Sequence, residues 1–232
     1  MKEKFQGFCV ASDTGRSADA ARSRERYRLV RDEAWRMLLK HRVRSLPVDV
    51  LEICRREGIR VVSYRKAREA GILALFEDAC AGNDGFALIL RGKKVIFFDD
   101  ALPIGRQRFT LGHELGHFVL GDVGPLPTAR NMEPTENDSE AERLANMFAA
   151  RLLSPACVLW GLGVRSPEKV AALCGLSRAA SEWRFKRLME LYARERDWLV
   201  RYGRSCFLVS PLEAKVYSRF RRFIKNQSRR SD

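Results

Sequence analysis

The sequence predicts an α+β protein in which a small β-sheet packs on a helix that carries two histidines four residues apart. Three observations support this fold class. Runs of apolar residues predict strands at 59–64, 86–90 and 95–98, and apolar residues at three- and four-residue steps predict helices before and after them. Two of the three histidines lie within one of these helices. At 232 residues, the chain is long enough to bury a sizeable core.

The N-terminal part of the chain predicts a loose end followed by one long helix. Residues 1–19 mix Gly, Ser, Asp and Thr without periodicity, which is typical of a disordered terminus. From Asp19 to His41, apolar residues recur at helical spacing and predict one buried stripe. His41 ends that stripe, and we expect this isolated histidine to be a packing or surface residue and not a ligand.

The next segments predict a helix followed by two strands. Residues 48–57 have helical periodicity, and Gly58 stands where a helix commonly ends. Residues 59–64 alternate and are rich in β-branched side chains, which favours a strand. Residues 72–76 are apolar enough to form a further strand.

A β-hairpin is predicted between residues 86 and 98. Two apolar runs, 86–90 and 95–98, flank the turn sequence Arg-Gly-Lys-Lys at 91–94. Both runs are continuously apolar, so we expect helices to cover the sheet, including the helix that carries the paired histidines. A sheet edge left accessible could pair with an extended peptide through backbone hydrogen bonds.

The helix predicted at 105–120, ended by Gly121, contains the pattern His113-Glu114-Leu-Gly-His117. Positions four apart lie on one helical face, so both imidazoles can bind one metal ion. A catalytic zinc takes three protein ligands and a water whose pKa falls to about 7. Glu114 is then placed to accept the proton of that water. The alternative is a helix with two surface histidines, and the rarity of histidine in this chain argues against it.

The third ligand is expected from the helix predicted at 139–153, which follows a loop at 122–138. We expect that loop to border the cleft. Glu140 shares a face with arginines and is predicted to be exposed, whereas Glu142 heads an apolar stripe, where a buried carboxylate needs a partner such as a metal ion. Alternatively, Ser139 and Glu142 form a capping box. Asn146, one turn after Glu142, can accept the outer N–H of a ligating histidine and fix its tautomer.

Two blocks of sequence, 108–117 and 142–155, together resemble the ImmA/IrrE family of bacterial and phage zinc metallo-endopeptidases. The resemblance extends upstream, where residues 46–49 and 58–62 are similar to the helix and strand that lead into the family's site. It covers about residues 27–190. The chain departs from the family where Gly112 replaces a common Ala and Ser154 replaces a common Met, and neither position is a proposed ligand.

This resemblance implies a gluzincin-like fold in which one catalytic Zn²⁺ per chain is bound by His113, His117 and Glu142, with Glu114 activating water. It also implies that the protein substrate is a helix-turn-helix transcriptional repressor, whose cleavage relieves repression.

The C-terminal part of the chain predicts a basic, helical extension. Residues 166–191 have the outline of two short helices, opened by Ser166-Pro167, that could form a helix-turn-helix-like pair or simply complete the catalytic domain. The pair carries four basic residues that could contact phosphates, namely Arg178, Arg184, Lys186 and Arg187. Residues 207–209 could form a short strand, and residues 216–224 predict an amphipathic basic helix.

The charge distribution leaves nucleic acid as a possible second partner. The formal net charge is +14, and residues 184–232 alone contain fourteen basic and five acidic residues, a net +9. Such a segment is either a solvated basic tail or a nucleic-acid footprint. Six dispersed cysteines without a CxxC pair indicate reduced thiols, and we see no membrane span or signal peptide, so we expect a cytoplasmic protein with no membrane partner.

Taken together, the sequence predicts a disordered N-terminus at 1–19, a zincin-like metallopeptidase domain at 20–165 and a helical basic extension at 166–232. The predicted activity is zinc-dependent hydrolysis of a peptide bond in a protein. The alternative is a non-proteolytic, zinc-containing regulator of transcription that binds DNA or protein.

Overall fold

The computed structural model describes residues 13–123, 139–202 and 210–229, with the exception of the side chains of residues 13–21 and of residue 198. In the first of these ranges the elements are, in order, α1 (Asp13–Lys40), α2 (Val50–Arg56), β1 (Arg60–Ser63), α3 (Tyr64–Glu69), the 3₁₀ helix η1 (Leu73–Phe76), α4 (Glu77–Cys80), β2 (Gly85–Leu90), β3 (Lys93–Phe98) and α5 (Ile104–Leu120). The later ranges contain α6 (Glu140–Leu153), α7 (Ala156–Gly161), α8 (Pro167–Cys174), α9 (Arg178–Tyr202) and α10 (Pro211–Ser228).

The fold is α+β, with one three-stranded sheet of order β1-β3-β2. The predicted hairpin is confirmed: β2 and β3 are antiparallel and joined by a two-residue turn, Arg91-Gly92, in which both residues have positive φ. This is the turn geometry whose twist matches that of the flanking strands. β1 pairs with β3 in parallel, so the predicted strand at 59–64 is also present.

The prediction of a strand at 72–76 is wrong, because this segment forms the 3₁₀ helix η1. Its apolar residues serve a different packing pattern. Leu73 and Phe76, three residues apart, both contact the sheet, as expected where residues i and i+3 eclipse. Leu75 between them is 76% exposed, so the segment has only one buried side.

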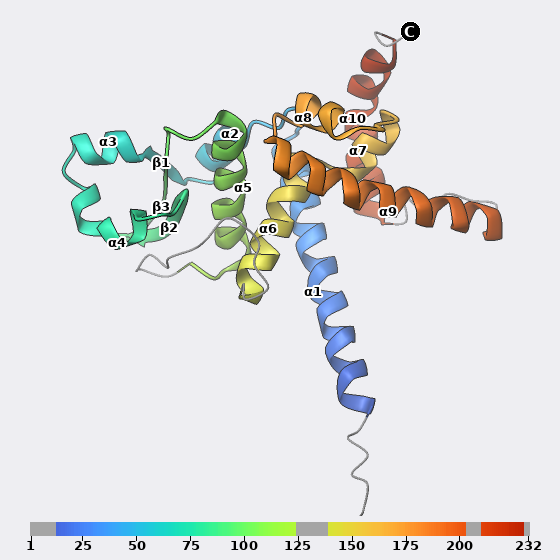
Figure 1. The fold of residues 1–232 in the computed structure, drawn as a ribbon, viewed down its shortest axis with the longest axis horizontal. Helices are drawn as coiled ribbons and strands as arrows, with labels where there is room; N and C mark the ends of the chain where they lie inside the picture. The colour runs from blue at the N-terminus through green and yellow to red at the C-terminus, as the bar shows by residue number, and fades with distance from the viewer. Residues whose placement is uncertain (1–12, 124–138, 203–209, 230–232) are drawn as a thin grey trace, which may run out of the picture.

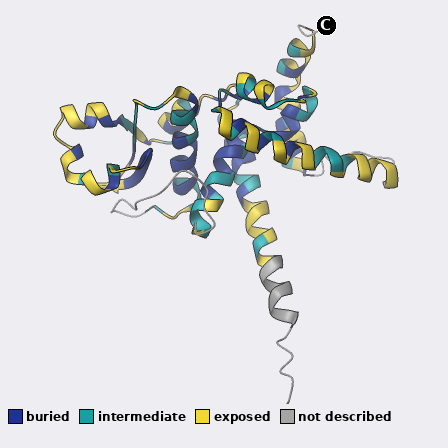
Figure 2. Ribbon diagram, viewed as in Figure 1, coloured by how far each residue is buried: buried dark blue, intermediate teal, exposed yellow. Residues whose placement is uncertain are grey.

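Helices cover both faces of the sheet, as its continuously apolar strands predict. On one face, Phe86, Leu88 and Phe97 pack with residues of α3, η1 and α4 in a small core. On the other face, Ala87 and Ile96 belong to the large core, and α5 lies against β2 and β3. Figure 1 shows α5 between the sheet and the bundle of remaining helices, and Figure 2 shows that α5 is buried along much of its length. The predicted metal-binding helix is therefore central.

The C-terminal helices share the large core with the rest of the chain. Val170 and Leu188 pack in the same cluster as Leu115 of α5, and so do Val216 and Phe220 of α10. α10 packs on α1 and α7, although these elements lie far apart in the sequence. The hydrophobic cluster thus continues across the expected boundary at residue 165.

Some expectations fall at the limits of the described chain. α1 begins at Asp13, so residues 13–19 are helical although the sequence predicts a disordered end at 1–19; residues 1–12 lie outside the described part. The loop expected at the cleft is described only to residue 123, and the strand expected at 207–209 is outside the described residues.

One described segment, Glu140–Gly161, is apolar and long enough to span a membrane by length and composition. Two-thirds of its apolar window (67%) is buried in the fold, and the segment is divided into α6 and α7 at Ser154-Pro155. Both features are typical of core helices.

Candidate metal centre

The two histidines of α5 point at each other from successive turns. His113 and His117 are fully buried, their ring centroids are 4.6 Å apart, and their Nε2 atoms are separated by 2.9 Å. The helix ends one turn later at Gly121, which adopts φ 83° and donates its N–H to the carbonyl of His117. The spacing of four residues therefore has the consequence expected from the sequence, namely two imidazoles on one face.

Of the two carboxylates considered for the third position, the structure brings Glu142 to the histidines. Its Oε2 lies 3.1 Å from Nε2 of His113, and its Oε1 lies 3.4 Å from Nε2 of His117. The backbone N–H of Glu142 donates to the hydroxyl of Ser139, the N-cap of α6, so the cap and the carboxylate use different groups of the same residue. Glu140 points elsewhere and pairs with Arg26 of α1.

The second nitrogen of each imidazole has an oxygen partner. Nδ1 of His113 lies 2.9 Å from Oδ1 of Asn146, as the sequence predicts. Nδ1 of His117 lies 2.9 Å from both oxygens of Asp122, a residue that sequence reasoning missed. The sequence did contain a signal for this contact, because Asp122 directly follows Gly121, the glycine that ends α5. At that point the chain turns back over the last turn of the helix, where His117 lies. These contacts fix each ring as the tautomer with hydrogen on Nδ1.

With hydrogen on Nδ1, each neutral imidazole directs the lone pair of Nε2 into the space shared with Glu142. One nitrogen from each histidine and one oxygen of Glu142 all lie within 4.8 Å of one another. Three electron-pair donors repel one another unless a cation lies between them. Ligand atoms around a tetrahedral zinc are separated by about 3.3 Å, close to the distances found among these atoms. The donor set therefore fits a divalent metal ion.

The charge state of Glu142 suits a metal ligand. Burial alone raises the pKa of its carboxyl, but positive charge at the histidines, when their imidazoles are protonated, outweighs burial and holds the pKa below its ordinary value; a cation held between neutral imidazoles acts in the same direction. The side chain is only 13% exposed. Glu142 is therefore an anion at neutral pH in a largely dry environment.

Glu114 lies beside the three-ligand group without belonging to it. Its side chain is fully buried, and its Oε1 is 4.0 Å from Nε2 of His113. The group whose ligand atoms converge consists of His113, His117 and Glu142, so Glu114 is placed to act on a small molecule bound next to the ion.

Close packing of α5 on α6 brings the ligands together. A Cβ added at Gly112 would lie 3.2 Å from Cδ1 of Leu153, and one added at Gly116 would lie 3.3 Å from the backbone of Ala145. Gly112 directly precedes the histidine motif and Gly116 lies within it, and the lack of a side chain at Gly116 lets the backbone of α6 approach α5 on the face that carries the site. At Gly112, where the related family commonly has Ala, the nearest atom would be the flexible end of the Leu153 side chain, which can move aside.

Four basic residues were predicted to contact phosphates, and one of these predictions is wrong. Arg184 is buried, and its Nε and Nη2 donate to the carbonyl of Ser154 at 3.0 and 2.6 Å, so it anchors the end of α6 inside the fold. Burial also lowers the pKa of Arg184 to about 10. Arg178, Lys186 and Arg187 are exposed. Arg178 lines a different hollow from the other three, so the four do not form one surface.

Comparison with protein families identifies a match over about half of the chain. The model of the IrrE N-terminal-like domain, a metallopeptidase family, matches residues 67–186. The matched range contains both histidines, Glu114 and Glu142. No curated protein matches the chain.

Proposed function

Because the chain belongs to the IrrE N-terminal-like family of metallopeptidases, we propose that it is a zinc-dependent endopeptidase of zincin-like fold whose metal ion is held by His113, His117 and Glu142. The observation that carries this proposal is the convergence of three ligand atoms on one buried point, with the far nitrogen of each imidazole held by an oxygen. Asn146 and Asp122 act as positioning residues. The match to the IrrE N-terminal-like family independently supports peptide hydrolysis.

The chemistry divides between the metal ion and the protein. When bound, the ion supplies Lewis-acid polarisation of the scissile carbonyl and makes a neighbouring water more acidic. Glu114 accepts the proton of the attacking water and then delivers it to the leaving amine.

The sheet offers a way to hold an extended substrate. β2 is an edge strand that pairs with β3, and it lies against α5, the helix that carries the catalytic residues. An extended peptide added to this edge would be held mainly through its backbone, which tolerates varied side chains. We therefore propose that the substrate segment binds beside β2.

The substrate that we propose is a helix-turn-helix transcriptional repressor, in line with the sequence resemblance described above. Such a substrate would be met in the cytoplasm. Among the described residues, Cys54, Cys80, Cys157 and Cys174 are free thiols, which supports a reducing compartment.

The experiment compares metal content and cleavage in the wild type and four variants. We expect one zinc per chain in the wild type, and loss or weakening of zinc binding in His113→Ala and Glu142→Ala. Glu114→Gln should keep the metal but lose cleavage of a candidate repressor by at least about a thousandfold, because it retains the shape of Glu114 without a basic oxygen. His41→Ala is the matched control, since His41 pairs with Glu57 away from the site.

Two outcomes would contradict the proposal. Turnover by Glu114→Gln at the wild-type rate would exclude Glu114 as the base. A full zinc content in both His113→Ala and Glu142→Ala would place the metal elsewhere. Zinc bound at these residues with no cleavage of any repressor, together with salt-sensitive binding to duplex DNA, would favour the alternative of a non-proteolytic regulator.

A further inference from the structure

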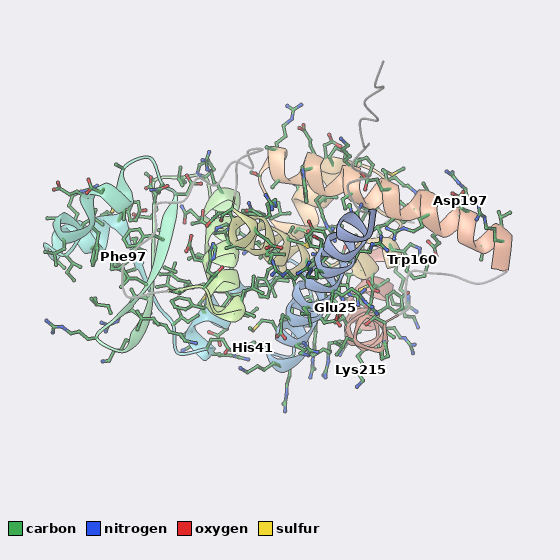
Figure 3. All side chains as sticks on the ribbon, turned by 90° about the horizontal axis from the view of Figure 1, so that it is seen from below. Glu25, His41, Phe97, Trp160, Asp197 and Lys215 are labelled. Atoms are coloured by element: carbon green, nitrogen blue, oxygen red, sulfur yellow. The ribbon has the colours of Figure 1, made fainter. Side chains whose placement is uncertain are left out.

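A second cleft lies on the opposite side of α6 from the metal site. It has a volume of about 760 Å³, within the range of small-molecule sites, and is lined by residues of α1, α6 and α9, by Ala156 of α7 and by Glu213 of α10. In Figure 3, α1 carries the label Glu25 and α9 the label Asp197. Arg151 of α6 lines the cleft nine positions after Glu142, and at about 100° per residue this places the two side chains on opposite faces of the helix.

The lining of this cleft is strongly basic. Six of its residues are basic and two are acidic; the basic residues are Arg31, Arg151, Arg184, Lys186, Arg187 and Arg194, and the acidic ones are Glu190 and Glu213. The acidic side chains do not balance this charge. Two of the basic residues already have a carboxylate partner: Arg187 pairs with Glu190, and Arg31 pairs with Asp32 of α1, which does not line the cleft. Among the described residues, no carboxylate lies within ion-pair distance of Arg151 or Arg184.

Two buried donors in the lining have no hydrogen-bond partner among the described residues. They are Nη1 of Arg151 and Nε1 of Trp35, a side chain that is only 1% exposed. A buried donor that is left unsatisfied costs free energy, and Glu213, the carboxyl that attracts Arg151, is not within ion-pair distance of it. Burial, together with repulsion from neighbouring arginines, lowers the pKa of Arg151 to about 9. A bound anion that reached them would offer acceptors to both donors and a counter-charge to Arg151.

The cleft also contains an exposed aromatic ring. Trp183 of α9 is 57% exposed and lies on the lining beside the arginines. Guanidinium groups match the geometry of phosphate oxygens, and an indole ring offers a surface on which a base can stack. We propose that this cleft binds a nucleotide, with its phosphoryl groups at Arg151 and Trp35 and its base against Trp183.

The proposal commits to a small phosphorylated molecule and not to a nucleic acid. The donors that most need a partner, on Arg151 and Trp35, are almost inaccessible to solvent, so a phosphoryl group at the end of a small molecule is better suited to approach them than the backbone of a duplex. The excess of basic over acidic side chains favours a ligand with two or more negative charges over a single carboxylate. The site shares no residue with the metal centre, so it stands independently of the proposed peptidase activity.

Binding is tested by calorimetric titration of the full-length, metal-free protein, so that neither metal–phosphate contacts nor peptidase activity contributes. The probes are ADP, inorganic phosphate and adenosine. We expect one ADP per chain, bound at least tenfold more tightly than phosphate or adenosine. Arg151→Met should weaken ADP binding by tenfold or more, and Trp183→Leu should weaken binding of ADP but not of phosphate.

Two further variants keep the test independent of folding. Arg187→Met removes an exposed charge at the rim and should weaken ADP binding several-fold without affecting the fold. Arg221→Met removes the same charge from an exposed position of α10 outside the cleft and should leave ADP affinity within twofold of the wild type. Equal losses in Arg151→Met and Arg221→Met would overturn the site, because they would show a general charge effect. The site would also be overturned if the protein showed no saturable binding of ADP. The same conclusion would follow if Arg151→Met weakened the binding of duplex DNA or of an acidic peptide but left ADP binding unchanged.

Discussion

At the level of single residues, the orientation of His117 depends on Asp122. Both oxygens of Asp122 lie 2.9 Å from Nδ1 of His117, and the backbone N–H of Asp122 also bonds to the carbonyl of His117. A carboxylate behind a ligating imidazole fixes its tautomer and raises its basicity. We predict that Asp122→Ala lowers zinc affinity by roughly 10–100-fold without unfolding the protein.

The affinity is measured by competition with a chromogenic chelator. Asp78→Ala is the control, because Asp78 is an exposed aspartate of α4 outside the site. Unchanged zinc affinity in Asp122→Ala would mean that this carboxylate does not support the ligand.

Glu213 should make the stability of the protein depend on pH. Its carboxyl is buried among Arg31, Asp32, Arg151 and Arg184, and burial, which outweighs attraction by the arginines, raises its pKa to about 7. A carboxyl whose pKa is raised on folding stabilises the folded protein while it is protonated. This contribution is complete below the pKa of the unfolded state and is lost as the pH rises through the pKa of the folded state. The free energy of unfolding should therefore fall by about 3 kcal/mol between about pH 4.5 and pH 7 because of this group.

Glu213→Gln removes this titration. The difference in unfolding free energy between pH 5 and pH 8, measured by urea denaturation in buffers without phosphate, should shrink relative to the wild type. Glu190→Gln, at an exposed glutamate of the same cleft, should leave the difference unchanged. A pH dependence in Glu213→Gln equal to that of the wild type would show that Glu213 is not the titrating group.

The side chains of the candidate metal centre were predictable where local spacing decides their direction. The four-residue step of His113 and His117 and the apolar stripe of Glu142 each place a side chain on a known helical face. Asp122 was missed because it follows the helix, where no periodicity applies. Arg184 was misassigned because an arginine that bonds a buried carbonyl has the same sequence signature as one on the surface.

At the level of elements, the start of α5 is held against the turn between α8 and α9. A Cβ added at Gly105 would lie 2.6 Å from the backbone nitrogen of Ser177 and 2.8 Å from the carbonyl carbon of Leu176. Backbone atoms cannot move aside as a side-chain end can, so we predict that Gly105→Ala lowers the free energy of unfolding by about 2 kcal/mol.

Gly112→Ala is the matched comparison within the same helix. Its nearest neighbour would be Cδ1 of Leu153 at 3.2 Å, the flexible end of a side chain, and alanine gains about 1 kcal/mol of helix propensity over glycine. We expect Gly112→Ala to be neutral or slightly stabilising in urea denaturation. If Gly105→Ala proved as stable as Gly112→Ala, the contact between α5 and the α8–α9 turn would be absent in solution.

At the level of the whole molecule, the order of elements was largely predictable, but their packing partners were not. Periodicity shows that a helix has a buried stripe, but it does not show which other helix covers it. The apolar stripe of α10, formed by Val216, Phe220 and Ile224, is an example, because the sequence predicts an amphipathic helix at 216–224 without showing what covers its apolar face. The structure places them in the large core, next to α1 and α7.

This packing predicts that the basic C-terminal helix is necessary for stability. Phe220 is completely buried in the large core, near Phe223, with ring centroids 6.4 Å apart. Its replacement by alanine removes apolar contacts and leaves a cavity, so Phe220→Ala should lower the free energy of unfolding by about 3–5 kcal/mol. Arg221→Ala, at the adjacent exposed position, should change it by less than about 0.5 kcal/mol. Equal stability of these two variants in urea denaturation would show that α10 is a separate appendage, and a chain ending before Pro211 would then keep its fold.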